Sequence, residues 1–382
     1  MAAERDATVL IIGGGVAGLT AAIALDRYGI DSLVFEQVDD VRKSQLGAGL
    51  SLGINVARAF KHLELLEQLT EVGAPIEERQ FLTDKGKDLG TSPISPDAEL
   101  VLGVLRPRFH QFLVEAVGAE KLRVGSKFVR FEQDEDGVTA HFADGGTARG
   151  EVLIGADGIK STLRAQLLGP AEPRYSGYVT RRGVLETDHA KNGLERIIFG
   201  SAKRFLYYPV GRWWVYWTAA TNEPPGGQQS GAEIKQTVLE RFAGWPEPVE
   251  SLVAATEESS TFLADTFDRD PVDRWGEGRV TLLGDAAHPM TWDRGQGAGQ
   301  GIEGAVLLAR ELAKGDDPAA ALRAWEAERI PRTAKIVNDS RRVGKLGQTE
   351  NPLPRMMHRV GARITTRRFR AGKGSEGLKV EF

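Results

Sequence analysis

The segment TVLIIGGGVAG, residues 8–18, joins a short apolar run to three spaced glycines. A wholly apolar run of this length is typical of a strand buried on both faces of a parallel sheet. The glycines form the pattern G-x-G-x-x-G directly before the helical segment 19–28, and a second apolar run follows at 32–35. The order strand, glycine-rich turn, helix, strand predicts a βαβ unit.

Each glycine of this pattern has a separate task in a dinucleotide site. Gly13 permits the tight turn, Gly15 lets the backbone approach a pyrophosphate, and Gly18 lets the helix pack closely on the strand. The pyrophosphate then lies at the positive end of the helix. Glu36 ends the second strand, where a carboxylate accepts ribose hydroxyls. The predicted pocket also includes Val16, Ala17, Gln37 and Arg42.

The composition argues against several classes of protein. The chain has 382 residues, a formal net charge of −4 and no cysteine. The charge does not favour nucleic acid, and the absence of cysteine excludes disulfides and thiolate metal sites. No apolar run approaches the ~18 residues of a membrane span, and the first apolar run fits a strand better than a signal peptide. We expect a cytoplasmic protein without a metal, a nucleic-acid partner or stable membrane insertion.

Two further motifs follow predicted buried strands. The first is GADGIKSTLR at residues 155–164, and the second is GDAAHP at residues 284–289. In this order after the glycine motif, they resemble the single-component FAD-dependent aromatic hydroxylases, the p-hydroxybenzoate hydroxylase superfamily. Leu105-Arg106-Pro-Arg-Phe109 is similar to a short helix start of that family, with Phe109 in place of Leu. The resemblance covers residues 7–347.

This resemblance implies an α/β fold: a Rossmann-like, glutathione-reductase-type FAD-binding domain with an inserted, mainly antiparallel β-sheet substrate domain. Strand-like segments dominate from 173 to 274, which agrees with such an insertion. The predicted FAD-binding parts are 1–78, 105–172 and 275–347, and the predicted substrate parts are 79–104 and 173–274. The tail 348–382 is predicted to be a basic surface helix or a frayed end. Residues 54–72 have the periodicity of a helix.

The resemblance also implies roles for single residues. Asp285 would accept a hydroxyl of the FAD ribityl chain, and Arg106 would lie near the flavin chain or its phosphates. Asp157 would contribute to the FAD and NAD(P)H region, although an acid before a helix is also typical of a turn or cap. His288, beside a proline, is interpreted as structural. A helix would begin near Gly295–Gly299, in the glycine-rich stretch after GDAAHP, and direct its N-terminus at the flavin. This places Gly295, Gly297 and Ala298 at the cofactor.

The implied reaction is the transfer of one oxygen atom from a flavin C4a-hydroperoxide to a small aromatic or heteroaromatic substrate. NADH or NADPH and O₂ would be consumed, and the protein would be a monomer or homodimer. Two alternatives stay open. One is epoxidation of an alkene on the same fold, and the other is an FAD-holding scaffold or cyclase that does not oxygenate its ligand.

Segment 204–304 is most similar to a subgroup that includes FAD-dependent urate hydroxylase and zeaxanthin epoxidase-like proteins. By that likeness, Arg204 and Asp293 would face the flavin as a pair that activates the substrate. A strand-edge arginine beside a loop aspartate, without such a role, remains an alternative. The chain departs from the family in having Trp292 where a proline is usual, and Glu303-Gly304 where Glu-Asp is common.

The segment around residue 215 is rich in aromatic side chains. Trp213, Val215 and Trp217 alternate with Trp214 and Tyr216, so the two groups lie on opposite faces of one strand. One face is predicted to line the substrate cavity and the other to be core, but the pattern does not decide which. Tyr216 and Trp292 join Arg204 and Asp293 as the predicted catalytic residues.

Overall fold

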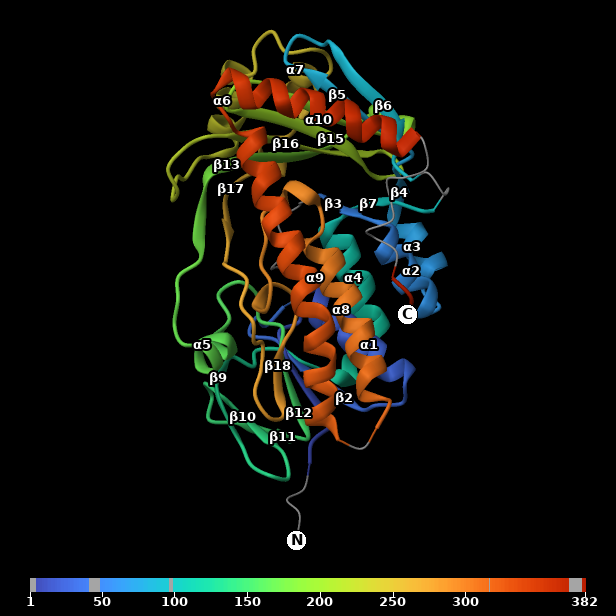
Figure 1. Ribbon diagram of the computed structural model, residues 1–382, viewed down its shortest axis with the longest axis vertical. Helices are drawn as coiled ribbons and strands as arrows, with labels where there is room; N and C mark the ends of the chain where they lie inside the picture. Colours follow the sequence, from blue (N-terminus) through green and yellow to red (C-terminus); the bar gives the residue numbers. More distant parts are fainter. Residues whose placement is uncertain (1–4, 41–48, 96–98, 316, 371–379) are drawn as a thin grey trace.

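The chain folds into two stacked sheet regions joined by long helices, seen in Figure 1. The computed structural model describes residues 5–40, 49–95, 99–315, 317–370 and 380–382, without the side chains of 354–359, 365 and 369. Arg42 lies outside the described residues. None of the described helices is long and apolar enough to cross a membrane.

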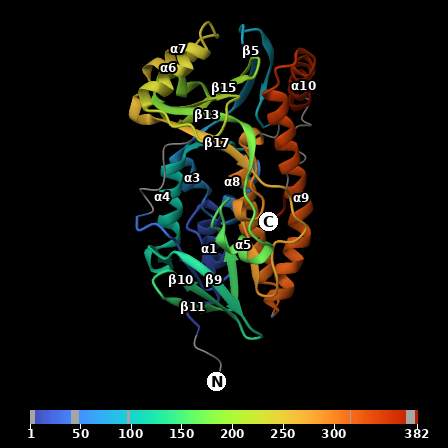
Figure 2. The same cartoon turned by 90° about the vertical axis from the view of Figure 1, so that its left-hand side faces the viewer.

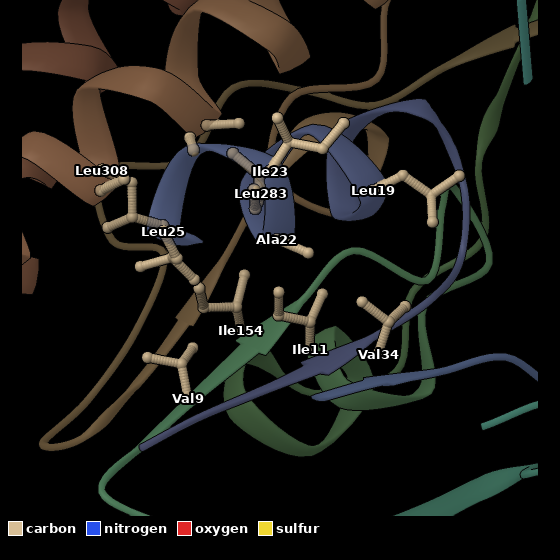
Figure 3. Packing of buried hydrophobic residues seen from close by; sticks show 14 of the residues in the cluster. Val9, Ile11, Leu19, Ala22, Ile23, Leu25, Val34, Ile154, Leu283 and Leu308 are labelled. Atoms are coloured by element: carbon tan, nitrogen blue, oxygen red, sulfur yellow. The ribbon is translucent and has the colours of Figure 1, made fainter. Parts of the chain in front are cut away.

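The first region is built on a five-stranded parallel sheet. Its order is β18 (Val280–Leu282), β12 (Val152–Gly155), β1 (Val9–Ile12), β2 (Ser32–Phe35) and β8 (Leu122–Arg123). The predicted βαβ unit is confirmed, because β1 and β2 pair in parallel on either side of α1 (Val16–Arg27). Figure 3 shows Ile11, Val34 and Ile154 directed at α1, whose Leu25 lies near Leu308. Leu308 belongs to α8 (Gly297–Leu312), so α1 is enclosed between sheet and helix.

Two small sheets flank this core. The first is a meander of β9 (Phe128–Gln133), β10 (Val138–Phe142) and β11 (Thr147–Gly150). The second combines β3 (Gly49–Leu52), β7 (Leu102–Leu105) and β4 (Gly73–Pro75) and lies against the upper sheet region. Helix α4 (Arg106–Val117) starts directly after β7, as the motif around Arg106 predicts, with a proline in its first turn.

The second region is a seven-stranded sheet in which all neighbours are antiparallel except β14 and β5. Its order is β17 (Thr261–Asp268), β13 (Arg174–Glu186), β16 (Trp214–Thr221), β15 (Lys203–Gly211), β14 (Leu194–Phe199), β5 (Glu78–Thr83) and β6 (Asp88–Pro93). Helices α6 (Gly231–Arg241) and α7 (Val249–Ala255) lie on the opposite side of this sheet from α10 (Pro352–Arg370) in Figure 2. The domain boundaries given above stay a prediction, and we propose them on the basis of this arrangement of strands.

The structure decides which face of β16 is core. Val215 and Trp217 are fully buried in a cluster with α6 and α7. Gly183 on β13 leaves room for the Trp217 ring, whose indole N–H donates to Thr256 Oγ1 at 2.9 Å. Tyr216 lies on the other face, which turns toward the first region.

One expectation about helices is corrected and another is resolved. Residues 54–72 form two helices, α2 (Ile54–His62) and α3 (Leu66–Val72), because Glu64 between them has a φ of +61° that no α-helix accepts. Of the two alternatives for the tail, the basic surface helix is found over 352–370, where α10 packs Ala362 against the sheet. The remaining helices are α5 (Thr162–Leu168) and α9 (Pro318–Gly347), and the latter runs between the two regions in Figure 1.

Candidate active site

The glycine loop has the geometry of a pyrophosphate cradle. Gly13 has a φ of +109°, and a Cβ there would lie 2.4 Å from the carbonyl oxygen of Ala156. A Cβ at Gly18 would lie 2.0 Å from the oxygen of Gly13. At Gly15 a Cβ would meet none of the described residues within 4 Å, which leaves the position ahead of α1 open. Two of the glycines therefore serve the fold, and Gly15 leaves its face clear for a ligand.

Glu36 is held at the end of β2, where a ribose would lie. Its Oε2 accepts from the Gly14 N–H at 2.7 Å, and its Oε1 accepts from the Val38 N–H at 3.0 Å. His110, a buried residue of α4, contacts the Gly14 carbonyl oxygen through Nε2 at 2.7 Å. No motif marks His110, so its support of the loop could not be read from the sequence.

The other predicted pocket residues of this region differ in exposure. Gln37 is exposed, and Val16 is partly buried at the start of α1. Ala17 lies beside Gly284 and Gly301, where added Cβ atoms would approach its own Cβ to 2.7 Å and 3.1 Å. Ala17 therefore serves the close packing of α1 against the GDAAHP loop and α8.

Arg106 and Asp285 come from different motifs but lie close enough for each charge to affect the pKa of the other. Both residues are exposed. Desolvation lowers the pKa of Arg106, and Asp285 opposes that shift. Desolvation likewise raises the pKa of Asp285, and Arg106 opposes it. A cation and an acid that are poorly hydrated yet accessible suit a polar ligand that would hydrogen-bond to both.

Asp157 acts as a helix cap. Its Oδ2 accepts from the backbone N–H groups of Thr162 at 2.9 Å and Leu163 at 3.2 Å, at the start of α5. Its Oδ1 is buried without a partner among the described residues. Burial raises the pKa of this carboxyl group. The capping interpretation therefore describes one oxygen, and the second remains free for the predicted contact with a cofactor.

Two arginines join the motifs to one another. Arg164 of GADGIKSTLR donates to the carbonyl oxygens of Ala286 and Ala287 at 2.8 and 3.1 Å. Arg269 donates to the Ile159 oxygen at 2.9 Å. Arginine side chains therefore join distant segments by donating to backbone oxygens. The spacing of the motifs does not reveal these contacts.

The loop that follows the GDAAHP motif ends in the expected helix N-terminus. Gly295 has a φ of +62°, and α8 begins at Gly297, within the predicted interval. A Cβ at Gly297 would have Met290 Cγ at 3.8 Å and Asp285 Oδ1 at 4.0 Å as its nearest neighbours, so the approach to the helix end is open. Ala298 follows and is partly buried. The free N–H groups of a 16-residue helix favour negative charge here.

Together these features fit FAD. The site combines an open glycine cradle at a helix N-terminus, a carboxylate at a strand end, the accessible Arg106 and Asp285, and a second helix N-terminus. Phosphates suit the first helix, and the electron-rich edge of a flavin suits the second.

A buried ionic network joins the first half of α8 to α2 and α9. Glu303 pairs with Arg329 and Arg332, and it accepts from Asn55 Nδ2 at 3.0 Å. Burial opposes ionisation of Glu303, but the two arginines together hold its pKa below the usual value. Next to it, Gly304 replaces the common family acid, and Arg329 Nε is left without a partner among the described residues.

Arg204 and Asp293 form the predicted pair, but both side chains are buried. Arg204 donates to Asp293 Oδ1, and their side chains are 4% and 0% exposed. The Tyr178 hydroxyl donates to Asp293 Oδ2 at 2.5 Å. From α9, Gly344 and Gly347 make room for the pair, since Cβ atoms there would come within 2.6 Å of Asp293 Oδ2 and 2.9 Å of Arg204 Cδ.

Trp292 covers this pair. The Arg204 guanidinium carbon lies 4.5 Å from the centre of the Trp292 ring, and Tyr178 meets the same ring edge-on. The Trp292 ring also packs on the apolar cluster that contains Tyr208 and Tyr216. Its indole N–H is buried without a partner among the described residues. Trp292 therefore separates Arg204 from the space that Arg204 was expected to face.

The face of the sheet that turns toward the first region packs against this loop and forms an aromatic wall. Tyr208 and Tyr216 lie side by side with ring centres 5.3 Å apart, and a Cβ at Gly49 would lie 2.5 Å from Tyr216. Burial raises the pKa of Tyr208, so its hydroxyl stays neutral. The Thr218 hydroxyl is buried with no partner among the described residues. The wall is mostly aromatic and carries one unsatisfied hydroxyl.

His288 is structural, as interpreted from the sequence. Its ring packs 5.4 Å from Trp275, centre to centre, and it is 5% exposed. Burial, assisted by the charge of Arg329, lowers the pKa of His288 to about 3. An imidazole with so low a pKa is a weak base at neutral pH.

Comparison with known proteins agrees with the assignment of this site to FAD. A family model described as an FAD binding domain matches residues 6–340. Aurachin C monooxygenase/isomerase of Stigmatella aurantiaca is 38% identical over 349 residues, which cover 90% of each chain. FAD-dependent urate hydroxylase of Klebsiella pneumoniae subsp. pneumoniae is 33% identical over 341 residues, covering 87% of this chain and 88% of that protein.

Solved structures agree in the same way. Klebsiella pneumoniae HpxO in complex with FAD and uric acid matches with a TM-score of 0.90 at 30% identity, over 98% of both chains. A salicylate hydroxylase substrate complex matches with a TM-score of 0.77 at 26% identity, over 97% of this chain and 93% of that one. These matches confirm the predicted fold class and the predicted cofactor, FAD.

Proposed function

The chain belongs to the FAD binding domain family, among FAD-dependent aromatic hydroxylases, and on this premise we propose that it hydroxylates a small aromatic or heteroaromatic compound at the expense of NADH or NADPH. The observation that carries this proposal is the aromatic wall of Tyr208 and Tyr216 opposite the loop that precedes α8. Flat aromatic walls suit flat substrates.

The division of labour follows from the site. FAD, once reduced, supplies the chemistry that activates O₂. The chain binds the substrate beside the flavin, orients it and excludes water. The N-terminus of α8 stabilises negative charge on the reduced cofactor, with Glu303 and its arginines holding that helix in place.

We assign the four predicted catalytic residues to two roles. Tyr216 and Trp292 line the substrate space, and the unpaired indole N–H of Trp292 is a donor for a substrate oxygen or nitrogen. Arg204 and Asp293 hold Trp292 in position, because the stacked guanidinium is itself fixed by Asp293. Direct contact of Arg204 with a substrate would require the Trp292 ring to move.

Alkene epoxidation is a second candidate. It is favoured by the burial of Arg204, since covering that cation leaves an apolar wall. The curated relatives also include zeaxanthin epoxidase of Solanum lycopersicum, 34% identical over 326 residues, or 81% of this chain and 49% of that protein.

The test is turnover by the FAD-loaded protein with panels of hydroxylated aromatics, heteroaromatics and non-phenolic alkenes. The proposal expects substrate-stimulated oxidation of NADH or NADPH together with a product heavier by one oxygen atom. Product from the aromatic panels supports hydroxylation, and product confined to alkenes supports epoxidation. Coenzyme oxidation that yields only hydrogen peroxide with every panel would contradict both.

Trp292→Pro and Trp292→Phe separate the roles of the ring. If Trp292 shields Arg204, the proline variant gains affinity for anionic aromatics, whereas the phenylalanine variant keeps the shield and loses only the indole N–H. Equal KM values for anionic and neutral substrates across all three proteins would argue against the shielding role.

A further inference from the structure

Helix α10, residues 352–370, has an unusual charge pattern. The segment contains six arginines and neither aspartate nor glutamate, in a chain whose net charge is −4. Among the described side chains of the helix, Arg363, Arg367, Arg368 and Arg370 are exposed. None of the ion pairs found among the described residues involves the first three of these. Within the part of the chain that the structure describes, these three arginines therefore present positive charge without a paired acid.

One face of α10 is fixed to the molecule. Ala362 packs into an apolar cluster with Phe81, Leu89 and Phe199 of the sheet. Thr366 lies against β6, where a Cβ at Gly90 would come within 2.7 Å of its Oγ1. The Arg370 side chain donates to the Thr91 carbonyl oxygen at 2.7 Å. The attached face thus orients the rest of the helix toward the outside, as Figure 2 shows.

The opposite face carries an exposed apolar ridge. Val360 and Ile364 are 47% and 53% exposed, and Leu353 is 61% exposed. At about 100° per residue, Val360 and Ile364 lie on the side of the helix opposite Ala362. Exposed leucine, valine and isoleucine on one helical line are costly unless a partner covers them.

We propose that the face of α10 formed by the ridge Leu353, Val360 and Ile364 and by Arg363, Arg367 and Arg368 binds the surface of an anionic phospholipid bilayer. Such a helix lies in the plane of the interface, with its apolar side chains among the acyl chains and its arginines at the lipid phosphates.

The ridge distinguishes a bilayer from other anionic partners. Nucleic acid would use the arginines but would leave Val360 and Ile364 in water. A second copy of this chain would cover the ridge but would bring two rows of arginines together, and like charges repel. Of these three partners, only the anionic bilayer offers both an apolar phase for the ridge and negative charge for the arginines.

The same helix lies next to the substrate wall. Ile197 packs both on the cluster that contains Ala362 and on the cluster that contains Tyr208 and Tyr216. Binding through α10 would therefore bring the wall of the proposed substrate site close to the lipid surface. The membrane proposal itself does not depend on which substrate is used.

The experiment is co-sedimentation of the FAD-loaded full-length protein with vesicles. Phosphatidylcholine vesicles are compared with vesicles containing phosphatidylglycerol, at low and at high salt. The double variants are Val360→Asp with Ile364→Asp, which charges the ridge, and Arg363→Gln with Arg367→Gln, which removes cations. Val129→Asp is the matched control, because Val129 is 47% exposed on β9, in the other sheet region. Circular dichroism and FAD content verify folding of each variant.

We expect sedimentation with phosphatidylglycerol only, weakened by salt. Each arginine removed should weaken binding about fivefold, the ridge variant should weaken it at least about tenfold, and Val129→Asp should bind as the unaltered protein does. The proposal is overturned if the protein does not sediment with anionic vesicles, or if the ridge variant sediments with them as the unaltered protein does. It is equally overturned if light scattering shows a dimer that the ridge substitutions dissociate while no lipid binding is found. The same holds if duplex DNA binds as tightly as the vesicles do and the ridge substitutions leave the affinity for DNA unchanged.

Discussion

A single methyl group on α9 should disturb the closed cluster around Asp293. In Gly344→Ala the new Cβ would lie 2.6 Å from Asp293 Oδ2 and 3.0 Å from its Cγ, closer than real Cβ atoms approach. Asp293 cannot retreat freely, because Arg204 and Tyr178 hold its two oxygens and its side chain is fully buried. Either α9 or the loop must therefore shift.

Two effects of opposite sign decide the outcome. Alanine is favoured over glycine inside a helix by ~1 kcal/mol. Overpacking a filled site costs ~1–3 kcal/mol, and separating a buried ion pair costs ~3–5 kcal/mol. The clash should prevail, so we expect Gly344→Ala to be destabilised by about 1–2 kcal/mol net, with partial rather than complete separation of the pair.

Gly361→Ala is the matched control. Gly361 also lies inside a helix, α10, but a Cβ there would meet nothing within 4 Å, so only the propensity gain of ~1 kcal/mol remains. Guanidinium unfolding followed by tryptophan fluorescence and circular dichroism compares the two variants. The midpoint should fall for Gly344→Ala and be unchanged or higher for Gly361→Ala. Equal or greater stability of Gly344→Ala would refute the tightness of the cluster.

Three further variants test other parts of the site. Gly15→Ala should leave the stability of the apoprotein nearly unchanged, since a Cβ there meets none of the described residues, yet weaken FAD binding in a fluorescence titration by about tenfold or more; unchanged affinity would contradict the open cradle. Because His288 has a pKa lowered to about 3, the unfolded chain binds one more proton below pH ~6.5, so stability falls by ~1.4 kcal/mol per pH unit from there toward pH 3. His288→Gln should remove that one-proton slope in denaturant midpoints measured from pH 7 to 5, and an unchanged slope would count against a buried neutral imidazole. Glu303→Gln should cost ~3–5 kcal/mol, because Arg329 keeps its charge while losing its partner. Thermal melts measure this loss. The exposed-pair control Glu132→Gln should leave the melting temperature unchanged, and similar losses in the two variants would argue against the buried network.

Much of the fold was predictable because its signals are local. The βαβ unit, the helix start at Arg106 and the helix in the glycine loop each depend on a few neighbouring residues, and the structure has all three. The split between α2 and α3 was missed, because a positive φ at Glu64 leaves no mark in apolar periodicity. The roles of the individual site residues stay predictions.

Contacts between distant segments account for what was missed at the site. His110, Arg164 and Arg269 each contact backbone far along the chain, and none of these contacts follows from spacing. The pairing of Arg204 with Asp293 was expected from a family likeness. Its closure beneath Trp292 was not, because the glycines that accommodate the pair come from α9, some fifty residues beyond the loop.

By itself the sequence determined the βαβ unit and its dinucleotide-type glycine turn, since glycine spacing and short apolar runs act through neighbouring residues. The family and FAD as cofactor followed from the resemblance of three ordered motifs to a known family. The sequence also determined that Val215 and Tyr216 lie on opposite faces of one strand. Only the tertiary structure decided which face is core, because α6 and α7 cover Val215 whereas the loop before α8 approaches Tyr216. The same holds for Arg204, whose accessibility depends on the ring of Trp292 and on two glycines of α9. Alternation along a strand is a property of its backbone, but burial is a property of whatever packs against it.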